Sequence, residues 1–433
     1  MKALLKLVRV RPRGGKTTTA LGTAGLWQIA NYAIPLLTFP YLARILGPTG
    51  FGILGIGTAI ITYAAILTDW GFAYTATQSA SRLRGDPVAL NQLVWATIAA
   101  KLMFFVSSSL LVAGGAALFV ADPVLRVVLW LSLLTLVGNV FNLDWLLRGT
   151  ELFGRFATTS VIGRLFAVPL VYLLVHTPSD VPAAAFAIAI SAPITALLTF
   201  HVSVRAGLVS APVFDFRAMR HGIRDGMHLF VSTAMISLYT NSLLVILGFT
   251  GGLQQTGMFS GADKVRRPVQ SLYTPLSMVF FPRINHLTET DPEEARRLSL
   301  KVLRIQGTLA LVLALGLCIA APLAVRILLG SSFEGAVSTL HILSWVIFLV
   351  GLSNVLGLMI MLPFGLKSAF SRCVSLGAVV GFGLAVPLSW MFGAEGAASA
   401  AVVAEITVTS AMFFVLWRRF EWFRQGVFSF SWG

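Results

Sequence analysis

Charged side chains gather within one turn of an otherwise apolar part of the chain. The group comprises Asp263, Lys264, Arg266 and Arg267, and Gln270 follows three residues later. Asp263, Arg267 and Gln270 are spaced four and three residues apart, so a helix would carry them on one face. An ionisable group at the centre of a bilayer costs about 2.5–3.5 kcal/mol on insertion scales, and such groups usually face an interior or a water-filled cavity. The spacing therefore predicts a polar face that runs through much of a membrane.

Further polar residues interrupt other apolar segments of the chain. They are Asn31, Asp69, Lys101, Arg164, Asn241 and Glu405. Structural explanations stay open for several of them: Lys101 could extend to a nearby membrane interface, and the two asparagines could simply join neighbouring helices. Asp263 could likewise form a static ion pair with Arg266 or Arg267. Arg164 is harder to explain in these terms, because its segment is apolar for a full turn on either side.

Cations outnumber carboxylates among these groups by five to three. The excess favours a passage that receives an anion such as a pyrophosphate, and arginine suits that role because its planar guanidinium can hold two phosphate oxygens at once. We expect the substrate pathway to use ten residues: Asn31, Asp69, Lys101, Arg164, Asn241, Asp263, Lys264, Arg266, Arg267 and Gln270. The three carboxylates, Asp69, Asp263 and Glu405, are the candidates for coupling to an ion.

The composition requires these groups to be positioned by membrane-spanning helices. Of 433 residues, 57% are hydrophobic and only 11% are charged, whereas soluble domains contain about 25% charged residues. As helices, apolar runs such as 21–43 and 124–147 are long enough to cross about 30 Å of hydrocarbon, and the run 308–325 is nearly so. Backbone groups in hydrocarbon must be bonded internally, so these runs are predicted to be helices. A β-barrel is excluded because its strands would alternate polar and apolar residues.

The hydropathy pattern predicts about twelve transmembrane helices in an all-α integral membrane protein. They cover residues 21–43, 52–80, 91–119, 124–147, 152–175, 181–204, 226–248, 255–282, 302–329, 335–362, 368–392 and 395–417. The two termini and one alternate set of loops together carry 24 of the 32 lysines and arginines. By the positive-inside rule, these loops and both termini are cytoplasmic. The net charge of +15 therefore reflects membrane topology, and nucleic-acid binding is not expected.

Two similar halves are indicated by short recurring strings. Residues 45–50 (ILGPTG) recur as 246–251 (ILGFTG), and AVPL at 167–170 recurs at 385–388. Six helices per half give the repeats the same orientation, so we expect two lobes around a central cavity. The predicted divisions are a basic N-terminus at 1–20, lobes at 21–206 and 226–417, a cytoplasmic linker at 207–225 and a tail at 418–433.

Motifs for metal, cofactor or covalent chemistry are not recognisable in the sequence. Cys318 and Cys373 fall in different predicted helices, and the six histidines lack ligand spacing. The string GGKT at 14–17 resembles the end of a P-loop, but Val10 replaces the first glycine. We therefore expect neither a metal nor a cofactor, and no enzymatic activity.

Several strings, in order along nearly the whole chain, resemble one family. The stretch NYAIPLLTFPYLARILGP at 31–48 is followed by DWGF at 69–72, DW at 144–145, YTNS at 239–242 and GLSN at 351–354. They are similar to bacterial O-antigen and exopolysaccharide flippases of the Wzx type. These belong to the multidrug/oligosaccharidyl-lipid/polysaccharide (MOP) exporter superfamily. Gln78 is a departure, because the family often has arginine near this position.

The resemblance implies a fold, a substrate and a location. The fold would be the V-shaped, MATE-like pair of six-helix lobes. The substrate would be a polyprenyl-pyrophosphate-linked oligosaccharide, flipped to the outer face of a bacterial inner membrane by alternating access. Membrane lipid would surround the protein, and a polysaccharide polymerase and chain-length regulator could be partners. The alternatives are a multidrug antiporter, a lipid II flippase, which usually has two more helices, and a membrane glycosyltransferase or polymerase.

Overall fold

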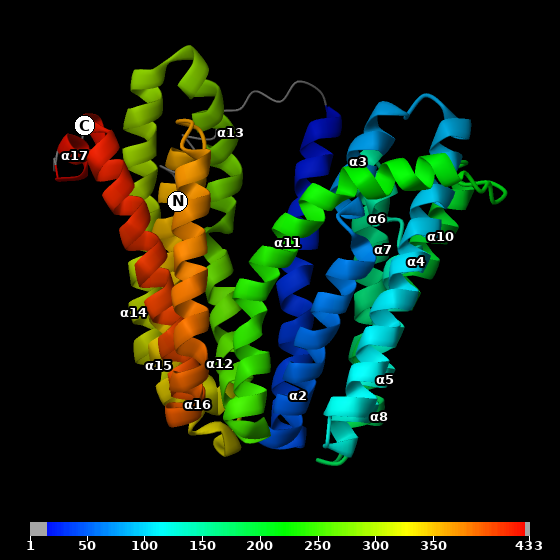
Figure 1. The fold of residues 1–433 in the computed structure, drawn as a ribbon, viewed down its shortest axis with the longest axis horizontal. Coiled ribbons are helices and arrows are strands. Elements are labelled where there is room, and N and C mark those ends of the chain that lie inside the picture. The colour runs from blue at the N-terminus through cyan, green and yellow to red at the C-terminus, as the bar shows by residue number, and fades with distance from the viewer. Residues whose placement is uncertain (1–14, 429–433) are drawn as a thin grey trace. The chain divides into compact units, whose positions relative to one another are not determined.

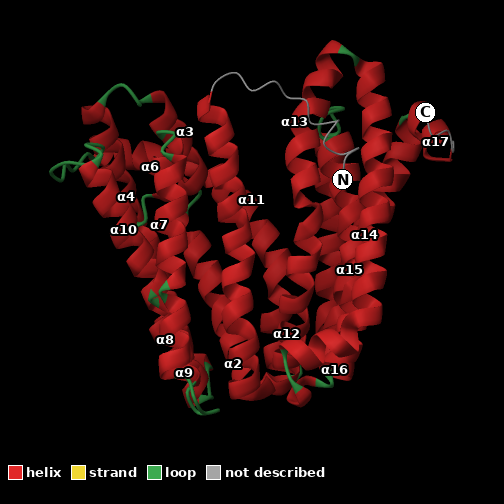
Figure 2. Ribbon diagram, turned by 180° about the vertical axis from the view of Figure 1, so that it is seen from behind, coloured by secondary structure: helices red, strands yellow, loops and turns green. Residues whose placement is uncertain are grey.

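The regular elements of the protein are helices throughout the part that the structure describes. A computed structural model describes residues 15–428, and no strand occurs within them (Figure 2). Eight helical segments in this range are long and apolar enough to cross a membrane. The protein is therefore a multi-pass membrane protein, as the composition predicts.

The chain divides into two compact units. The first unit comprises Met1–Phe39, Ile60–His176 and Pro182–Ile236, and the second comprises Pro40–Ala59, Thr177–Val181 and Ser237–Gly433. Helix α2 (Gly15–Asp69) and helix α11 (Phe216–Thr250) each contribute residues to both units. Helix α11 begins within the stretch predicted as a linker.

The first unit is built mainly from helices that follow α2 in the sequence. They are α3 (Phe72–Arg82), α4 (Pro87–Phe119), α5 (Pro123–Phe141), α6 (Asp144–Gly149), α7 (Phe153–Leu165), α8 (Ala167–Leu174), α9 (Val181–Ala189) and α10 (Ser191–Arg205). Helix α5 packs against both α4 and α10 (Figure 1). A core of buried apolar side chains, including Phe72, Leu90, Val94 and Trp145, holds α3, α4 and α6 together.

Several segments predicted as single helices are interrupted. The segment 52–80 breaks after Asp69, where Trp70 and Gly71 have φ angles of 49° and 84°. The segment 124–147 breaks at Asn142, whose Oδ1 accepts a hydrogen bond of 3.2 Å from the backbone N–H of Asp144. Glycine tolerates the left-handed conformation, and asparagine competes for backbone hydrogen bonds. Both breaks therefore have a local cause in the sequence.

The second unit is built mainly from helices that follow α11. They are α12 (Gly252–Gln270), α13 (Thr274–Thr290), α14 (Pro292–Leu328), α15 (Ala336–Asn354), α16 (Lys367–Arg419) and α17 (Glu421–Phe428). A 3₁₀ turn, η1 (Ser271–Tyr273), separates α12 from α13, another, η2 (Ser331–Phe333), follows α14, and a π-helical segment, η3 (Val355–Met361), extends α15. Helix α15 packs against both α14 and α16.

Two backbones cross at unusually short range in this unit. A Cβ atom built on Gly257 of α12 would lie 1.8 Å from the carbonyl oxygen of Pro48. Helix α2 therefore passes α12 with no room for a side chain at that point. This contact fixes the position of α12 against α2, and so the position of the backbone that carries the charged side chains.

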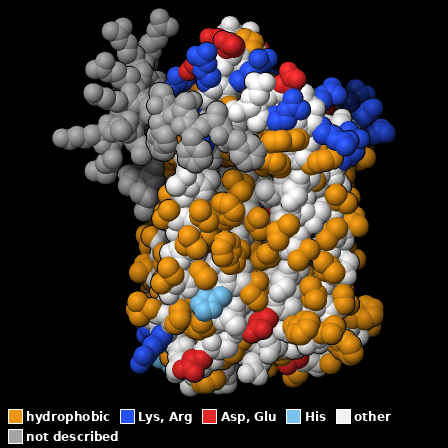
Figure 3. All heavy atoms as spheres, turned by 90° about the vertical axis from the view of Figure 1, so that its left-hand side faces the viewer, with side chains coloured by type: hydrophobic (Ala, Val, Ile, Leu, Met, Phe, Trp, Pro, Cys, Tyr) orange, Lys and Arg blue, Asp and Glu red, His pale blue; other side chains and the backbone are white. Residues whose placement is uncertain are grey.

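One face of the second unit is apolar across its middle (Figure 3). Figure 3 shows a broad band of hydrophobic side chains, with lysine and arginine gathered mainly at one end. Val312, Ile319 and Leu323 of α14 are exposed apolar side chains of this unit. This distribution suits a surface in contact with hydrocarbon.

Candidate functional site

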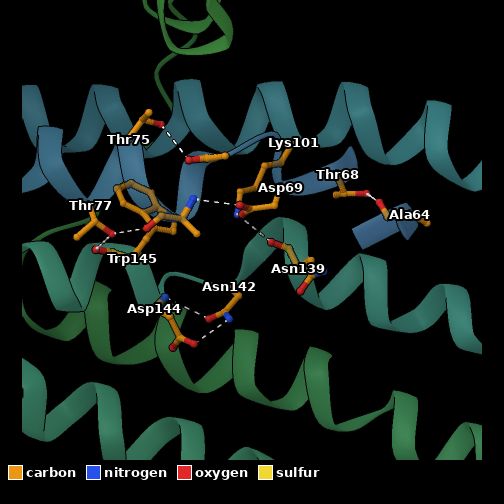
Figure 4. Close-up of polar contacts among 12 residues, drawn as sticks. Ala64, Thr68, Asp69, Thr75, Thr77, Lys101, Asn139, Asn142, Asp144 and Trp145 are labelled. Atoms are coloured by element: carbon orange, nitrogen blue, oxygen red, sulfur yellow. Dashed lines mark hydrogen bonds and ion pairs between the residues drawn. The ribbon is translucent and has the colours of Figure 1, made fainter. Parts of the chain in front are cut away.

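A buried ion pair lies at the break between α2 and α3. The Nζ of Lys101 lies 2.8 Å from Oδ1 of Asp69, and it also donates to the carbonyl oxygen of Asn139 at 3.4 Å (Figure 4). The Lys101 side chain is only 4% exposed and that of Asp69 28%. Lys101 therefore does not extend to a membrane interface, and the hypothesis that it does is wrong. Burial makes a close partner necessary, because an unpaired charge in a low-dielectric interior is very costly.

Asp69 has a second role at the same break. Its Oδ2 accepts a hydrogen bond of 3.1 Å from the backbone N–H of Ala73, in the first turn of α3. A carboxylate at the start of a helix satisfies backbone N–H groups that have no partner within the helix. One side chain thus both neutralises Lys101 and caps the half-helix that follows.

Trp70 fixes the same break against α11. Its ring stacks between Phe104 and Phe230, with centroid distances of 4.1 and 4.2 Å, and its Nε1 donates to the carbonyl oxygen of Ile223 at 2.9 Å. A Cβ on Gly226 would lie 2.4 Å from the Trp70 carbonyl oxygen. The first half of α11 is therefore packed directly on the break. The sequence gives a weak signal for this, in the glycines Gly222 and Gly226 of α11.

The break in 124–147 carries a polar cluster that the sequence analysis missed. Asn142 Nδ2 donates to Oδ2 of Asp144 at 3.0 Å, and the Ser160 hydroxyl lies 3.4 Å from Oδ1 (Figure 4 shows the Asn142–Asp144 contact). The hydroxyl of Thr199 donates to Asn142 at 3.2 Å. Asn142 and Asp144 stand directly after an apolar run, a signal that could have found them.

Arg164 lies on the exposed surface of the first unit. Its guanidinium is in electrostatic range of the Asp144 carboxylate. Of the sequence-predicted residues of the first unit, Asp69 and Lys101 are paired with each other, whereas Arg164 interacts with Asp144, which was not predicted. The side chain of Asn31 lies outside the described residues.

Asp263 of α12 is held by two arginines. Its Oδ1 accepts from Arg266 at 2.6 Å (Nη2) and 3.0 Å (Nε), and its Oδ2 accepts from the Nε of Arg267 at 2.5 Å. Arg266 also donates to the side-chain oxygen of Gln270. The ion pair left open by the sequence is therefore present, and it involves both arginines. The side chains of Asp263 and Arg266 are 8% and 12% exposed, whereas that of Arg267 is 51% exposed.

Lys264, in the same turn of α12, contacts helix α2. Its Nζ lies 4.4 Å from the ring centroid of Phe51, a cation–π contact with α2. Asn241 of α11 donates from Nδ2 to the hydroxyl of Ser237 at 3.1 Å.

A cavity of about 410 Å³ lies within the second unit beside the Asp263 cluster. Its polar lining includes six of the sequence-predicted residues: Asn241, Asp263, Arg266, Arg267, Gln270 and Glu405. Glu405 belongs to α16, so the lining is assembled from helices far apart in the sequence. Apolar residues of α11, α12, α15 and α16, among them Phe259 and Phe382, complete the wall. The cavity can hold a polar ligand of modest size, since typical ligand cavities measure about 300–1,000 Å³.

Metal binding has no support in the described part of the chain. Within it, no three His, Cys, Asp or Glu side chains are placed to hold an ion together. Cys318 and Cys373 are free thiols.

Known proteins similar to this chain fall in one group by sequence. Two relatives carry the name "Putative O-antigen transporter". One, from Escherichia coli (strain K12), is 32% identical over 389 residues, covering 89% of this chain and 93% of the relative. The other, from Shigella dysenteriae, is 24% identical, and the match covers 88% of this chain and 96% of that relative.

Solved structures with a similar fold are transporters. An inward-facing multidrug resistance MATE family transporter of the MOP superfamily matches with a TM-score of 0.73 at 15% identity, covering 94% of this chain and 96% of its own. The lipid II flippase MurJ, in an inward closed conformation, also has a TM-score of 0.73, at 12% identity, with coverage of 93% and 90%. These likenesses show the fold. The profile of the polysaccharide biosynthesis proteins matches residues 21–288, and the chain belongs to that family.

Proposed function

We propose that the protein is a flippase for a polyprenyl-pyrophosphate-linked oligosaccharide, such as an O-antigen or exopolysaccharide repeat unit. The observation that carries this proposal is the match to the Escherichia coli relative across 93% of that protein's length. The fold supports it, because both the lipid II flippase and the multidrug transporter share it. Transport of this kind needs no covalent chemistry.

Twelve crossings and cytoplasmic termini are part of the proposal. Two of the apolar helical segments, Ala33–Arg82 and Lys367–Arg419, contain 50 and 53 residues. At about 1.5 Å per residue, each is long enough for two crossings of a bilayer. Kinks at Gly47 and Gly393 provide the turning points. The excess of basic residues in alternate loops supports cytoplasmic termini, and the Escherichia coli relative supports a bacterial inner-membrane location.

The physical problem for such a substrate is its headgroup. Burying a hydroxyl without a hydrogen-bond partner costs roughly 2–7 kcal/mol, depending on the reference state. A sugar headgroup carries many hydroxyls, so its unassisted crossing is very slow. We infer that polar groups on the two lobes, at 21–206 and 226–417, replace water around the headgroup while the lipid tail stays in the bilayer. The lobes would alternate access by rocking against each other.

Arg164 and Arg267 are our candidates for contacting the pyrophosphate. Both are exposed within their own units, and Arg164 lies in otherwise apolar surroundings in the sequence. The other pathway residues would serve the headgroup or support these two arginines. Asp69, Asp263 and Glu405 remain the candidates for coupling to an ion. A polymerase and a chain-length regulator are the proposed partners.

The proposal is tested in cells that lack the gene. Deletion should abolish surface polysaccharide and leave lipid-linked repeat units inside, and the wild-type gene should restore the polysaccharide. Arg164→Ala and Arg267→Ala should fail to restore it at normal membrane abundance. Unchanged polysaccharide in the deletion strain would contradict the function, whereas full restoration by both variants would contradict only the site assignment.

The multidrug antiporter is the rival within the same fold. It predicts that deletion sensitises cells to organic cations and leaves surface polysaccharide unchanged. The cation excess among the intramembrane groups disfavours it, because a receptor for cations is expected to be acidic.

A further inference from the structure

We propose that the cavity of the second unit binds a sugar of the headgroup, with the pyrophosphate outside it at the rim near Arg267. This inference rests on the proposed flippase function. It assigns the two chemically different parts of one substrate to different places.

Charge balance argues against a pyrophosphate inside the cavity. Two carboxylates and two guanidiniums line it, those of Asp263, Glu405, Arg266 and Arg267. Asp263 already accepts hydrogen bonds from both arginines. Part of the positive charge of the arginines is therefore already neutralised, and a pyrophosphate would face two carboxylates of its own sign. Lys264, the other cation of this turn, is in contact with Phe51 and is not part of the lining.

Hydrogen-bonding capacity argues for hydroxyl groups. Each sugar hydroxyl both donates and accepts, so it is best matched by a wall on which donors and acceptors are interspersed. Arg266 supplies donors, Asp263 and Glu405 supply acceptors, and the side-chain amides of Asn241 and Gln270 supply both. The chain of contacts from Gln270 through Arg266 to Asp263 holds three of these groups in place. Such fixed groups lose little freedom when a ligand binds.

The remaining wall suits the apolar face of a sugar ring. Phe259 is buried, but Phe382 is 39% exposed and lines the same cavity. Ala385, Ala401 and Ala404 of α16 leave space beside it. A few polar groups set among aromatic and aliphatic side chains are what a small-molecule site requires.

Arg267 connects the cavity to the proposed anion position. Its Nε contacts Asp263, and its side chain is half exposed, in contrast to Arg266. The guanidinium has further N–H donors that are suited to phosphate oxygens. A sugar in the cavity and its attached pyrophosphate at Arg267 are therefore adjacent, as the covalent structure of the substrate demands.

Binding of two lipids to the purified full-length protein in lipid nanodiscs tests this assignment. One probe is the lipid-linked repeat unit extracted from polymerase-deficient cells of the source strain, and the other is bare polyprenyl pyrophosphate. We expect Gln270→Ala and Phe382→Ala to weaken binding of the sugar-bearing lipid about tenfold each, as the loss of one well-placed contact predicts. Binding of the bare lipid should be unchanged. Arg267→Gln should weaken binding of both lipids.

The controls separate a local effect from misfolding and from failure of the function itself. Phe392→Ala removes a 58% exposed phenylalanine of the same helix outside the cavity and should change neither affinity. Ala401→Leu narrows the cavity without removing a polar contact and should act only on the sugar-bearing lipid. Equal losses for both lipids in the cavity variants, or no loss for either, would overturn the sugar assignment. If the wild-type protein bound neither lipid, the proposed flippase function would fail together with the sugar assignment.

Discussion

The two units hold their intramembrane charges in different ways. In the first, one lysine meets one aspartate, and the aspartate also caps the helix that follows a break in the chain. In the second, one aspartate meets two arginines, one of them half exposed, beside a cavity. The first arrangement is neutral and closed, which suits a structural joint. The second lines a cavity with polar side chains, which suits a ligand site.

The largest stability effect should come from Asp69→Asn. The change leaves Lys101 buried without a counter-charge, and breaking a buried pair in this way costs about 3–5 kcal/mol. Unfolding in detergent should show this loss, together with reduced membrane abundance. Replacing both partners, as in Asp69→Asn with Lys101→Met, should recover most of it. An unaltered single variant would contradict the view of this pair as a structural joint.

Trp70→Ala should have the next largest effect on the free energy of unfolding. It removes two ring stacks and the hydrogen bond to Ile223, and we expect a loss of about 3 kcal/mol, at the low end for such substitutions because the ring is not fully buried. Trp70→Phe keeps the stacks and loses only the hydrogen bond, so about 1 kcal/mol is expected. The unfolding midpoints of the two variants should differ accordingly. Equal midpoints would show that the stacks contribute nothing.

Asp263→Asn sharpens the comparison because it should lower stability but strengthen binding of an anionic lipid. Stability should fall by about 2 kcal/mol, less than for Asp69→Asn, since Arg267 is half exposed. Binding of bare polyprenyl pyrophosphate should become tighter, because the cavity lining gains net positive charge. Weaker binding of that lipid would count against the exclusion of the anion by these carboxylates.

The smallest effect is expected at the second break of the first unit. Ser160→Ala removes one long contact of 3.4 Å to Asp144, and about 0.5 kcal/mol should be lost. Thermal unfolding of this variant beside the wild type is sufficient to measure it. A loss comparable to that of Asp69→Asn would mean that the Asp144 cluster is also a structural joint.

The sequence was most informative where a physical constraint is strong. Membrane insertion dictates long apolar helices, and the composition of 21–43 or 308–325 permits little else. The i, i+3 and i+4 spacing likewise placed Asp263, Arg267 and Gln270 beside one cavity. Glu405 reaches the same cavity from α16, which spacing within one helix could not predict.

Long-range packing and local side-chain hydrogen bonds account for what the sequence did not reveal. The pairing of Lys101 with Asp69 joins α4 to the end of α2, and nothing local in either segment identifies the partner. The break at Asn142 follows from a competing side-chain hydrogen bond, which hydropathy does not register. The contacts of Lys264 with Phe51 depend on the close crossing of α2 and α12. The lobe boundaries and the pathway residues remain predictions.

Flipping in reconstituted vesicles tests the proposed function most directly. Vesicles containing the purified protein and the lipid-linked repeat unit are treated from outside with a membrane-impermeant reagent that modifies the sugar. We expect nearly all of the headgroups to become accessible, against about half in protein-free vesicles, where the slow unassisted crossing of polar groups leaves the inner leaflet protected. Accessibility that stays at the protein-free level, with correctly folded protein in the membrane, would contradict translocation by this protein.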